Sequence, residues 1–77
     1  MDFKEQLGVR ISSARGFNRL GQNELAKMIG VSKQTISNWE NGRRTPDADL
    51  IRRLCEILGC TSDYLLGLTD SFVQKRT

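Results

Sequence analysis

The apolar residues of the first third of the chain recur at helical spacing. They are Phe3, Leu7, Ile11 and Ala14. A period of three to four residues is that of one buried face of an α-helix. The pattern therefore predicts a first helix over residues 2–18. Gly8 and Gly16 fall inside it, and each would weaken an exposed helix by roughly 1 kcal/mol.

A second helix is predicted from residue 22 onward. Gly21 can serve as its N-cap, and Leu20 and Leu25 then occupy the positions of a hydrophobic staple. Glu24 falls in the first turn, where a negative charge suits the helix dipole. Gly30 ends this helix, because glycine readily adopts the left-handed conformation that terminates helices.

The same start signals return within three residues and predict a third helix. Ser32 can act as its N-cap, with Val31 and Ile36 as the staple. The helix runs to about Asn41, and Gly42 ends it.

Two more helices complete the predicted fold. The fourth is marked by apolar residues at helical spacing, which are Ile51, Leu54, Cys55 and Leu58. Asp47 and Asp49 are expected in its first turn, Gly59 ends it, and Thr61 can cap a short fifth helix. Short loops between five helices predict an all-α fold, a compact five-helix bundle. We expect one domain over residues 1–67 and a C-terminal tail over residues 68–77.

Composition limits the compartment and the partners only loosely. The chain has 77 residues with twelve Lys and Arg against nine Asp and Glu, a net charge of +3. This mild excess does not by itself indicate nucleic acid. No apolar run is long enough to span a bilayer, and the charged start lacks the apolar stretch of a secretory signal. We expect a cytoplasmic protein, associated with the nucleoid if it binds DNA.

Cysteine and histidine usage argues against a metal site and against catalysis. Two cysteines are present, Cys55 and Cys60, and there is no histidine. A secreted domain of this size would normally carry several disulfides, so a reducing compartment with free thiols is expected. The sequence offers no metal-ligand cluster and no phosphate-cradling glycine loop. We expect no enzyme, no cofactor, no metal and no small-molecule ligand.

The second and third helices have the spacing of a helix-turn-helix. Apolar residues are expected where the two helices touch, namely Leu25, Ile29, Val31, Ile36 and Trp39. Ala26 supplies the small residue at the crossing and Gly30 the turn. In such a motif the second helix protrudes into the major groove of DNA, and the first braces it across the backbone.

Over residues 7–67 the chain resembles the lambda-repressor-like, Cro/cI-type (XRE) helix-turn-helix family. The matching stretches are Arg10-Ile11, Arg15, Gln22-Asn23-Glu24-Leu25-Ala26, Ile29-Gly30-Val31-Ser32, Ile36-Ser37-Asn38-Trp39-Glu40-Asn41-Gly42, Pro46-Asp47, Leu58-Gly59 and Asp63-Tyr64-Leu65-Leu66-Gly67. The run from Ser37 to Gly42 is the most specific of them.

The resemblance implies a recognition helix over residues 33–41 with defined base-facing positions. Lys33, Gln34 and Asn38 match those positions, and Ser37 is a weaker candidate. The chemistry agrees, because lysine suits guanine O6 and N7, whereas glutamine and asparagine can pair bidentately with adenine. The alternative is that these side chains merely coat a surface helix.

Further residues are implied as contacts to DNA phosphates. Gln22, which opens the second helix, resembles the family's phosphate-binding glutamine. The other candidates are Ser32, Thr35, Asn41, Arg43 and Arg44. Hydroxyls and arginines near helix ends are the usual source of such positioning contacts. Arg52 and Arg53 have a weaker claim, since the fourth helix can equally present them to solvent.

One matching pair is expected to be structural. Arg15 and Glu40 resemble a family pair that forms a partly buried salt bridge, and a carboxylate aimed at phosphates would oppose binding. The chain departs from the family pattern at Gly21, where threonine or serine is usual, and at Arg19, where glycine is common. Asn18 tolerates left-handed geometry and is expected to replace that glycine.

These features predict a transcriptional regulator, a repressor, that binds double-stranded DNA. One helix reads too few base pairs for selectivity, so a homodimer on a pseudo-palindromic operator is expected. Apolar residues from Asp63-Tyr64-Leu65-Leu66 to Phe72-Val73 are the candidate dimer face, although Leu65 could instead close the core. The alternatives are an antitoxin-like, protein-binding adaptor and the DNA-binding end of a longer repressor.

Overall fold

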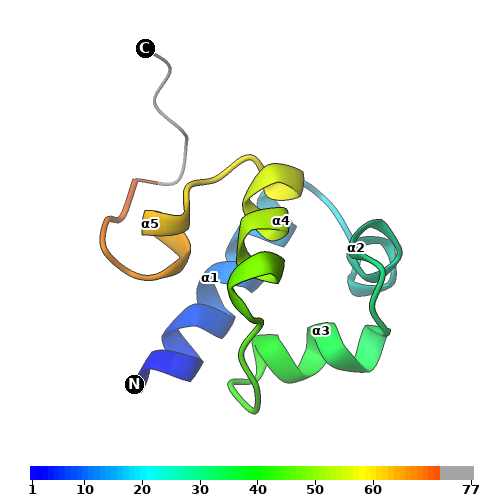
Figure 1. Ribbon diagram of the computed structural model, residues 1–77, viewed down its shortest axis with the longest axis horizontal. Coiled ribbons are helices and arrows are strands. Elements are labelled where there is room, and N and C mark those ends of the chain that lie inside the picture. Colours follow the sequence, from blue (N-terminus) through cyan, green and yellow to red (C-terminus); the bar gives the residue numbers. More distant parts are fainter. Residues whose placement is uncertain (72–77) are drawn as a thin grey trace.

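The computed structural model describes residues 1–71 and confirms the five-helix, all-α architecture (Figure 1). Its helices are α1 (Phe3–Phe17), α2 (Gln22–Ile29), α3 (Lys33–Glu40), α4 (Ala48–Leu58) and α5 (Ser62–Leu65). Within the described range none of them is both long and apolar enough to cross a membrane.

The core draws apolar side chains from every helix, with α1 passing behind α4 and reaching α3 and α5 (Figure 1). The largest fully buried side chains are Leu7, Ile11, Leu25, Ile29, Ile36, Leu54, Leu58, Cys60 and Leu65. Phe3 is the exception to the predicted apolar stripe. It lies one turn before Leu7, the first residue of α1 in the core, and is 51% exposed. Its assignment to the buried face was wrong.

Four of the five helices begin with a side-chain cap. Asp2, Ser32, Asp47 and Thr61 each accept a hydrogen bond from the backbone N–H three residues later. Asp47 is thus the N-cap of α4 and not a residue of its first turn. In α2 the cap is Gly21, whose N–H donates to the Glu24 carboxylate over 2.8 Å. These local bonds satisfy amides that helix geometry leaves without partners.

The turn after α1 corrects one prediction. Asn18 keeps an ordinary φ of −84°, and Arg19 takes the left-handed conformation with φ 57°. The reason lies in the side chain of Asn18, whose Nδ2 donates to the carbonyl oxygens of Ala14 at 2.8 Å and Leu58 at 2.9 Å. Asn18 is therefore fixed as the C-cap that ties α1 to α4, and the next residue makes the turn.

The turn between α2 and α3 needs a glycine. Gly30 has φ 87°, a region in which a Cβ atom is strained, and its N–H bonds to the carbonyl oxygen of Ala26. Only Val31 and Ser32 separate it from α3. This short connection gives the predicted helix-turn-helix and sets α3 along the lower edge of the molecule in Figure 1.

The two cysteines are reduced and buried. Burial raises the pKa of the Cys55 thiol and raises that of Cys60 to about 12. Both thiols therefore stay protonated near neutral pH and behave as small apolar side chains.

Candidate nucleic-acid interface

Helix α3 turns one face into the core and the other outward. Ile36 and Trp39 are buried against the other helices. The predicted base-facing residues lie on the remaining surface, where Lys33 and Gln34 are exposed and Ser37 and Asn38 are half-buried. The structure thus brings all four onto one outward side of a single rigid helix, as the spacing of polar and apolar positions requires.

Two of these side chains are already paired with each other. Nε2 of Gln34 donates to Oδ1 of Asn38 over 3.0 Å, across one helical turn. The bond leaves the Gln34 carbonyl oxygen and the Asn38 amide group available for other partners. A donor and an acceptor held side by side match the pattern that the major-groove edge of adenine presents. The pair can therefore act as one unit.

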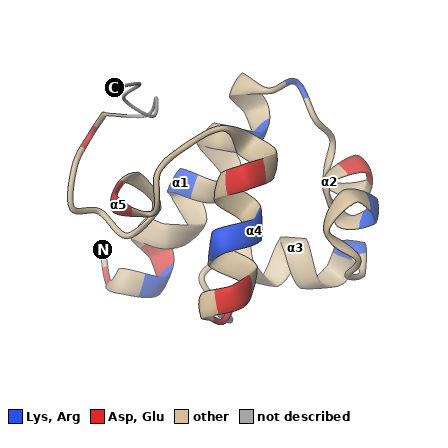
Figure 2. Ribbon diagram, turned by 45° about the horizontal axis from the view of Figure 1, so that its top comes forward, with Lys and Arg blue, Asp and Glu red and all other residues tan. Residues whose placement is uncertain are grey.

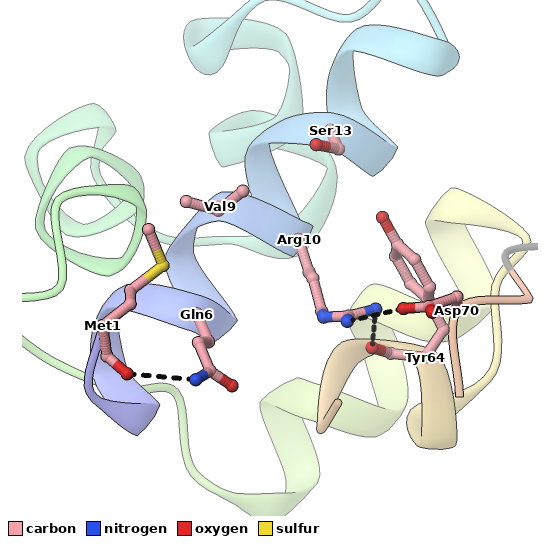
Figure 3. Close-up of a pocket in the computed structure, with 7 residues that line it drawn as sticks. All are labelled: Met1, Gln6, Val9, Arg10, Ser13, Tyr64 and Asp70. Carbon is pink, nitrogen blue, oxygen red and sulfur yellow. Dashed lines mark hydrogen bonds and ion pairs between the residues drawn. The ribbon is translucent and has the colours of Figure 1, made fainter. Parts of the chain in front are cut away.

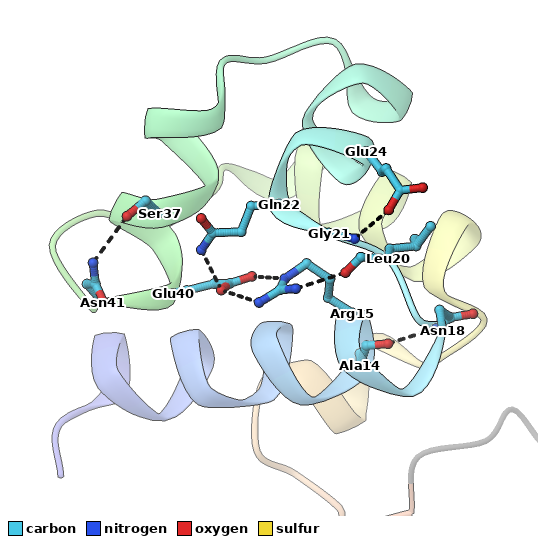
Figure 4. Close-up of polar contacts among 10 residues, drawn as sticks. All are labelled: Ala14, Arg15, Asn18, Leu20, Gly21, Gln22, Glu24, Ser37, Glu40 and Asn41. Carbon is cyan, nitrogen blue, oxygen red and sulfur yellow. Dashed lines mark hydrogen bonds and ion pairs between the residues drawn. The ribbon is translucent and has the colours of Figure 1, made fainter.

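The hydroxyls and amides at both ends of α3 are paired in the same way. The hydroxyls of Ser32 and Thr35 lie 2.9 Å apart, and Ser32 Oγ also accepts from the Thr35 N–H. At the other end, Nδ2 of Asn41 donates to Ser37 Oγ over 3.3 Å (Figure 4). Asn41 is the C-cap, so α3 ends at Glu40, one residue earlier than predicted.

Arg15 and Glu40 join α1 to α3 through a bidentate ion pair (Figure 4). Nε of Arg15 lies 2.7 Å from one carboxylate oxygen of Glu40, and Nη2 lies 3.0 Å from the other. Nη1 of Arg15 also donates to the carbonyl oxygen of Leu20 over 2.8 Å. The side chains are only 19% and 7% exposed. The hydrogen bond to Glu40 is the main reason that the pKa of Arg15 is raised.

Gln22 connects this ion pair to the start of α2. Its Nε2 donates to Oε1 of Glu40 over 3.0 Å (Figure 4). An amide NH₂ group carries two hydrogens, so one remains for a phosphate. The contact fixes the side chain at the N-terminal end of α2, beside amides that have no partner within the helix. Gln22 can therefore bind an anion while holding three helices together.

The loop between α3 and α4 carries Arg43 and Arg44, both exposed. They line a polar pocket of about 340 Å³ together with Thr45 and Lys4. Lys4 lies in the first turn of α1 and is a residue that the sequence analysis missed. No sequence signal places it there, because 38 positions separate Lys4 from Gly42 at the start of this loop. Only the packing of the loop on α1 brings them together.

Arg52 is not part of this cluster. It forms an exposed ion pair with Asp49 one turn earlier on α4, at 3.6 Å. Figure 2 shows basic positions on α1, α2, α3 and α4, with acidic ones beside them. The candidate interface therefore consists of particular side chains on α3 and the following loop, and not of a uniformly basic face.

Arg10 is a second residue whose role was missed. Its guanidinium lies 5.0 Å from the centre of the Tyr64 ring and donates to the carbonyl oxygen of Tyr64 (Figure 3). The same group donates to the carbonyl oxygen of Thr69 over 3.1 Å. It also forms an ion pair with Asp70 at 3.1 Å. Arg10 thus anchors α5 and the residues after it to α1. The predicted domain boundary after residue 67 stays a prediction.

A second surface feature lies between α4 and α5. A pocket of about 560 Å³ is lined by Ala48, Ile51, Arg52, Cys55, Glu56, Ser62 and Leu66. Of the predicted dimer residues, Leu65 is fully buried and belongs to the core, whereas Leu66 reaches this pocket. Phe72 and Val73 lie outside the described residues.

Comparison with known proteins agrees with this geometry. A family model described as helix-turn-helix matches residues 19–65. Repressor protein C2 of Salmonella phage P22 is 38% identical over 60 residues, which are 78% of this chain and 28% of that protein. A crystal structure of this repressor with a synthetic operator superposes with a TM-score of 0.74 at 38% identity, covering 78% of this chain and 91% of that one.

Two bacterial proteins show similar likeness. The transcriptional regulator ImmR of Bacillus subtilis is 34% identical over 71 residues, covering 92% of this chain and 56% of its own length. Antitoxin PezA of Streptococcus pneumoniae is 34% identical over 84 aligned positions, covering 91% of this chain and 53% of its own length. This chain therefore spans well under two thirds of these curated relatives.

Proposed function

This chain belongs to the helix-turn-helix family in its lambda-repressor (Cro/cI) branch, and from that premise we propose that it is a sequence-specific DNA-binding transcriptional repressor. Its partner is double-stranded DNA, with α3 in the major groove. Such a protein works on the chromosome, in the cytoplasm.

The observation that carries the proposal is the outward face of α3. Lys33, Gln34, Ser37 and Asn38 present four polar side chains on a helix whose inner face is locked by Ile36 and Trp39. Bidentate contacts from such side chains distinguish one base pair from another.

The flanking residues supply the contacts that hold α3 in register. We assign Gln22, Ser32, Thr35, Asn41, Arg43 and Arg44 to the sugar-phosphate backbone. They lie at the ends of α2 and α3 and in the loop that follows. Contacts of this kind orient the protein without selecting a sequence.

We further propose that two copies bind one operator through the surface between α4 and α5. In a two-fold interface, residue i of one copy meets residue j of the other and the reverse. Arg52 and Glu56 lie one turn apart on α4 and flank Ile51 and Cys55 in the same pocket. Antiparallel pairing of α4 with its copy would set Arg52 against the opposite Glu56. This charge complementarity around an apolar centre supports the dimer.

A protein-binding role is the second candidate, because antitoxin PezA is among the relatives. In that case the same domain would bind DNA and a protein partner at once. Binding of the operator by the purified chain alone, without a second protein, favours the repressor.

Selection from a pool of random duplexes tests the proposed function. The chain is incubated with the pool, bound duplexes are recovered and sequenced over several rounds, and we expect enrichment of a pseudo-palindromic site. Half-sites should lie about one helical turn apart. Binding of all duplexes alike, with no enriched sequence, would refute the claim of sequence-specific recognition.

A further inference from the structure

Lys4, Arg43 and Arg44 form a basic pocket from two distant parts of the chain. Thr45 completes its lining, and the volume is about 340 Å³. The loop is held against α1 at Gly42, whose φ is +74°. A Cβ atom at Gly42 would lie 3.0 Å from Cγ and 3.2 Å from Cα of Glu5. This close approach fixes where Arg43 and Arg44 stand relative to Lys4.

The three cations have no ion-pair partner among residues 1–71. The two carboxylates nearest to Lys4 in the chain are occupied elsewhere. Asp2 accepts from the N–H of Glu5 over 2.9 Å, and Glu5 accepts from the N–H of Asp2 over 3.2 Å. The capping box thus holds both carboxylates against the first amides of α1. Neither carboxylate forms an ion pair with Lys4, Arg43 or Arg44.

The position of this pocket relates it to the proposed interface. In Figure 1 the N-terminal end of α1 and the loop after α3 lie on the same lower side as α3 itself. A duplex lying along α3 would carry its backbone past the end of that helix. Three cations around a concave surface match the oxygens of a phosphodiester, which lysine binds as a point charge and arginine through its planar fork.

We propose that Lys4 joins Arg43 and Arg44 in binding a DNA backbone phosphate beyond the C-terminal end of α3. The first turn of α1 thereby becomes part of the DNA-binding surface, and the footprint extends past the helix-turn-helix. This inference rests on the proposed function. It predicts a contribution that is independent of sequence and sensitive to salt, because neutralising a phosphate releases condensed counterions.

The experiment measures binding of the full chain to a random-sequence duplex over a range of salt concentrations. Lys4→Gln should lower the slope of log K against log salt by about 0.9, the value for one lost phosphate contact. Lys4→Arg keeps the charge and should retain the slope. Lys27→Gln is the matched control, since it makes the same charge change at an exposed position about 140° around α2 from Gln22.

Each outcome decides the point. A lower slope for Lys4→Gln alone, with an unchanged thermal midpoint and the same sequence preference, supports the inference. A full slope for Lys4→Gln in a chain that still selects an operator would overturn it and leave the proposed function intact. If the native chain selects no operator, the result would instead contradict the proposed function. Saturable, Lys4-dependent binding of inorganic pyrophosphate together with a full DNA slope would identify a free-anion site and also overturn the inference.

Discussion

Gly8 in α1 lies directly against the backbone of Trp39 in α3. A Cβ atom at Gly8 would stand 2.5 Å from the carbonyl oxygen of Trp39 and 2.6 Å from that of Glu40. The two helices therefore approach as closely as backbone atoms allow. This contact fixes the distance between α1 and α3. It thereby fixes how far the predicted base-facing side chains project from the rest of the molecule.

Replacing Gly8 by alanine should destabilise the fold despite the better helix propensity of alanine. The new methyl group meets backbone atoms that cannot rotate away, and such overpacking costs about 1–3 kcal/mol or more. Gly16→Ala is the control in the same helix, because nothing lies within 4 Å of its added Cβ. That variant should gain about 0.5–1 kcal/mol. Urea denaturation measures both, and equal effects of the same sign would contradict this packing argument.

Removing Arg15 should cost far more than removing an exposed arginine. Arg15→Ala leaves the nearly buried carboxylate of Glu40 with Gln22 as its remaining side-chain donor. The expected loss in unfolding free energy is about 3 kcal/mol. At a concentration low enough to keep the chain monomeric, Arg52→Ala breaks only the exposed pair with Asp49 and should cost less than about 0.5 kcal/mol. Thermal melts compare the two, and similar midpoints would argue against the structural role of Arg15.

Gln34 and Asn38 should act on DNA as one unit. Each is hydrogen-bonded to the other, so removing either one leaves its partner without its orienting contact. Gln34→Ala or Asn38→Ala should each relax base preference by about 1–3 kcal/mol at a shared position. The double variant should lose clearly less than the sum of the two. Titration of the selected operator measures the coupling, and additive losses would show that the two side chains act separately.

Charge reversal on α4 tests the proposed dimer. Arg52→Glu and Glu56→Arg should each weaken self-association, because each places like charges opposite one another across the two-fold axis. The double variant restores opposite charges and should recover the native dimer constant. Sedimentation equilibrium with and without operator gives the comparison. A double variant as weak as the single ones would mean that α4 does not pair in this orientation.

Stability should fall at alkaline pH because of a buried thiol. Burial raises the pKa of Cys60 from 9.0 to about 12, so the folded chain holds a proton that the unfolded chain releases. The contribution of the protonated Cys60 thiol to the free energy of unfolding is complete below pH 9 and is lost as the pH rises toward 12. Cys60→Ala is less stable overall through its cavity but should show a shallower loss over this window. Unfolding free energies at several pH values test this, and parallel curves would contradict it.

The sequence alone predicted the local elements of this fold well. Left-handed glycines such as Gly30 and capping side chains such as Ser32 act on backbone groups a few residues away. Their effects can therefore be predicted from the local sequence. The same holds for the periodic apolar face that buries Leu25 and Ile36. The resemblance to a known family then supplied the pairing of Arg15 with Glu40.

Relationships between distant segments were decided only by the tertiary structure. Gly8 was expected to weaken α1, yet only glycine fits there because the backbone of α3 leaves no room for a Cβ atom. Arg19 takes the left-handed turn because the side chain of Asn18 is hydrogen-bonded to the carbonyl oxygen of Leu58, forty positions away. Lys4 becomes a neighbour of Arg43 because Gly42 packs on the first turn of α1. Helix signals depend on neighbours in the chain, whereas these contacts depend on how closely the packed helices approach one another.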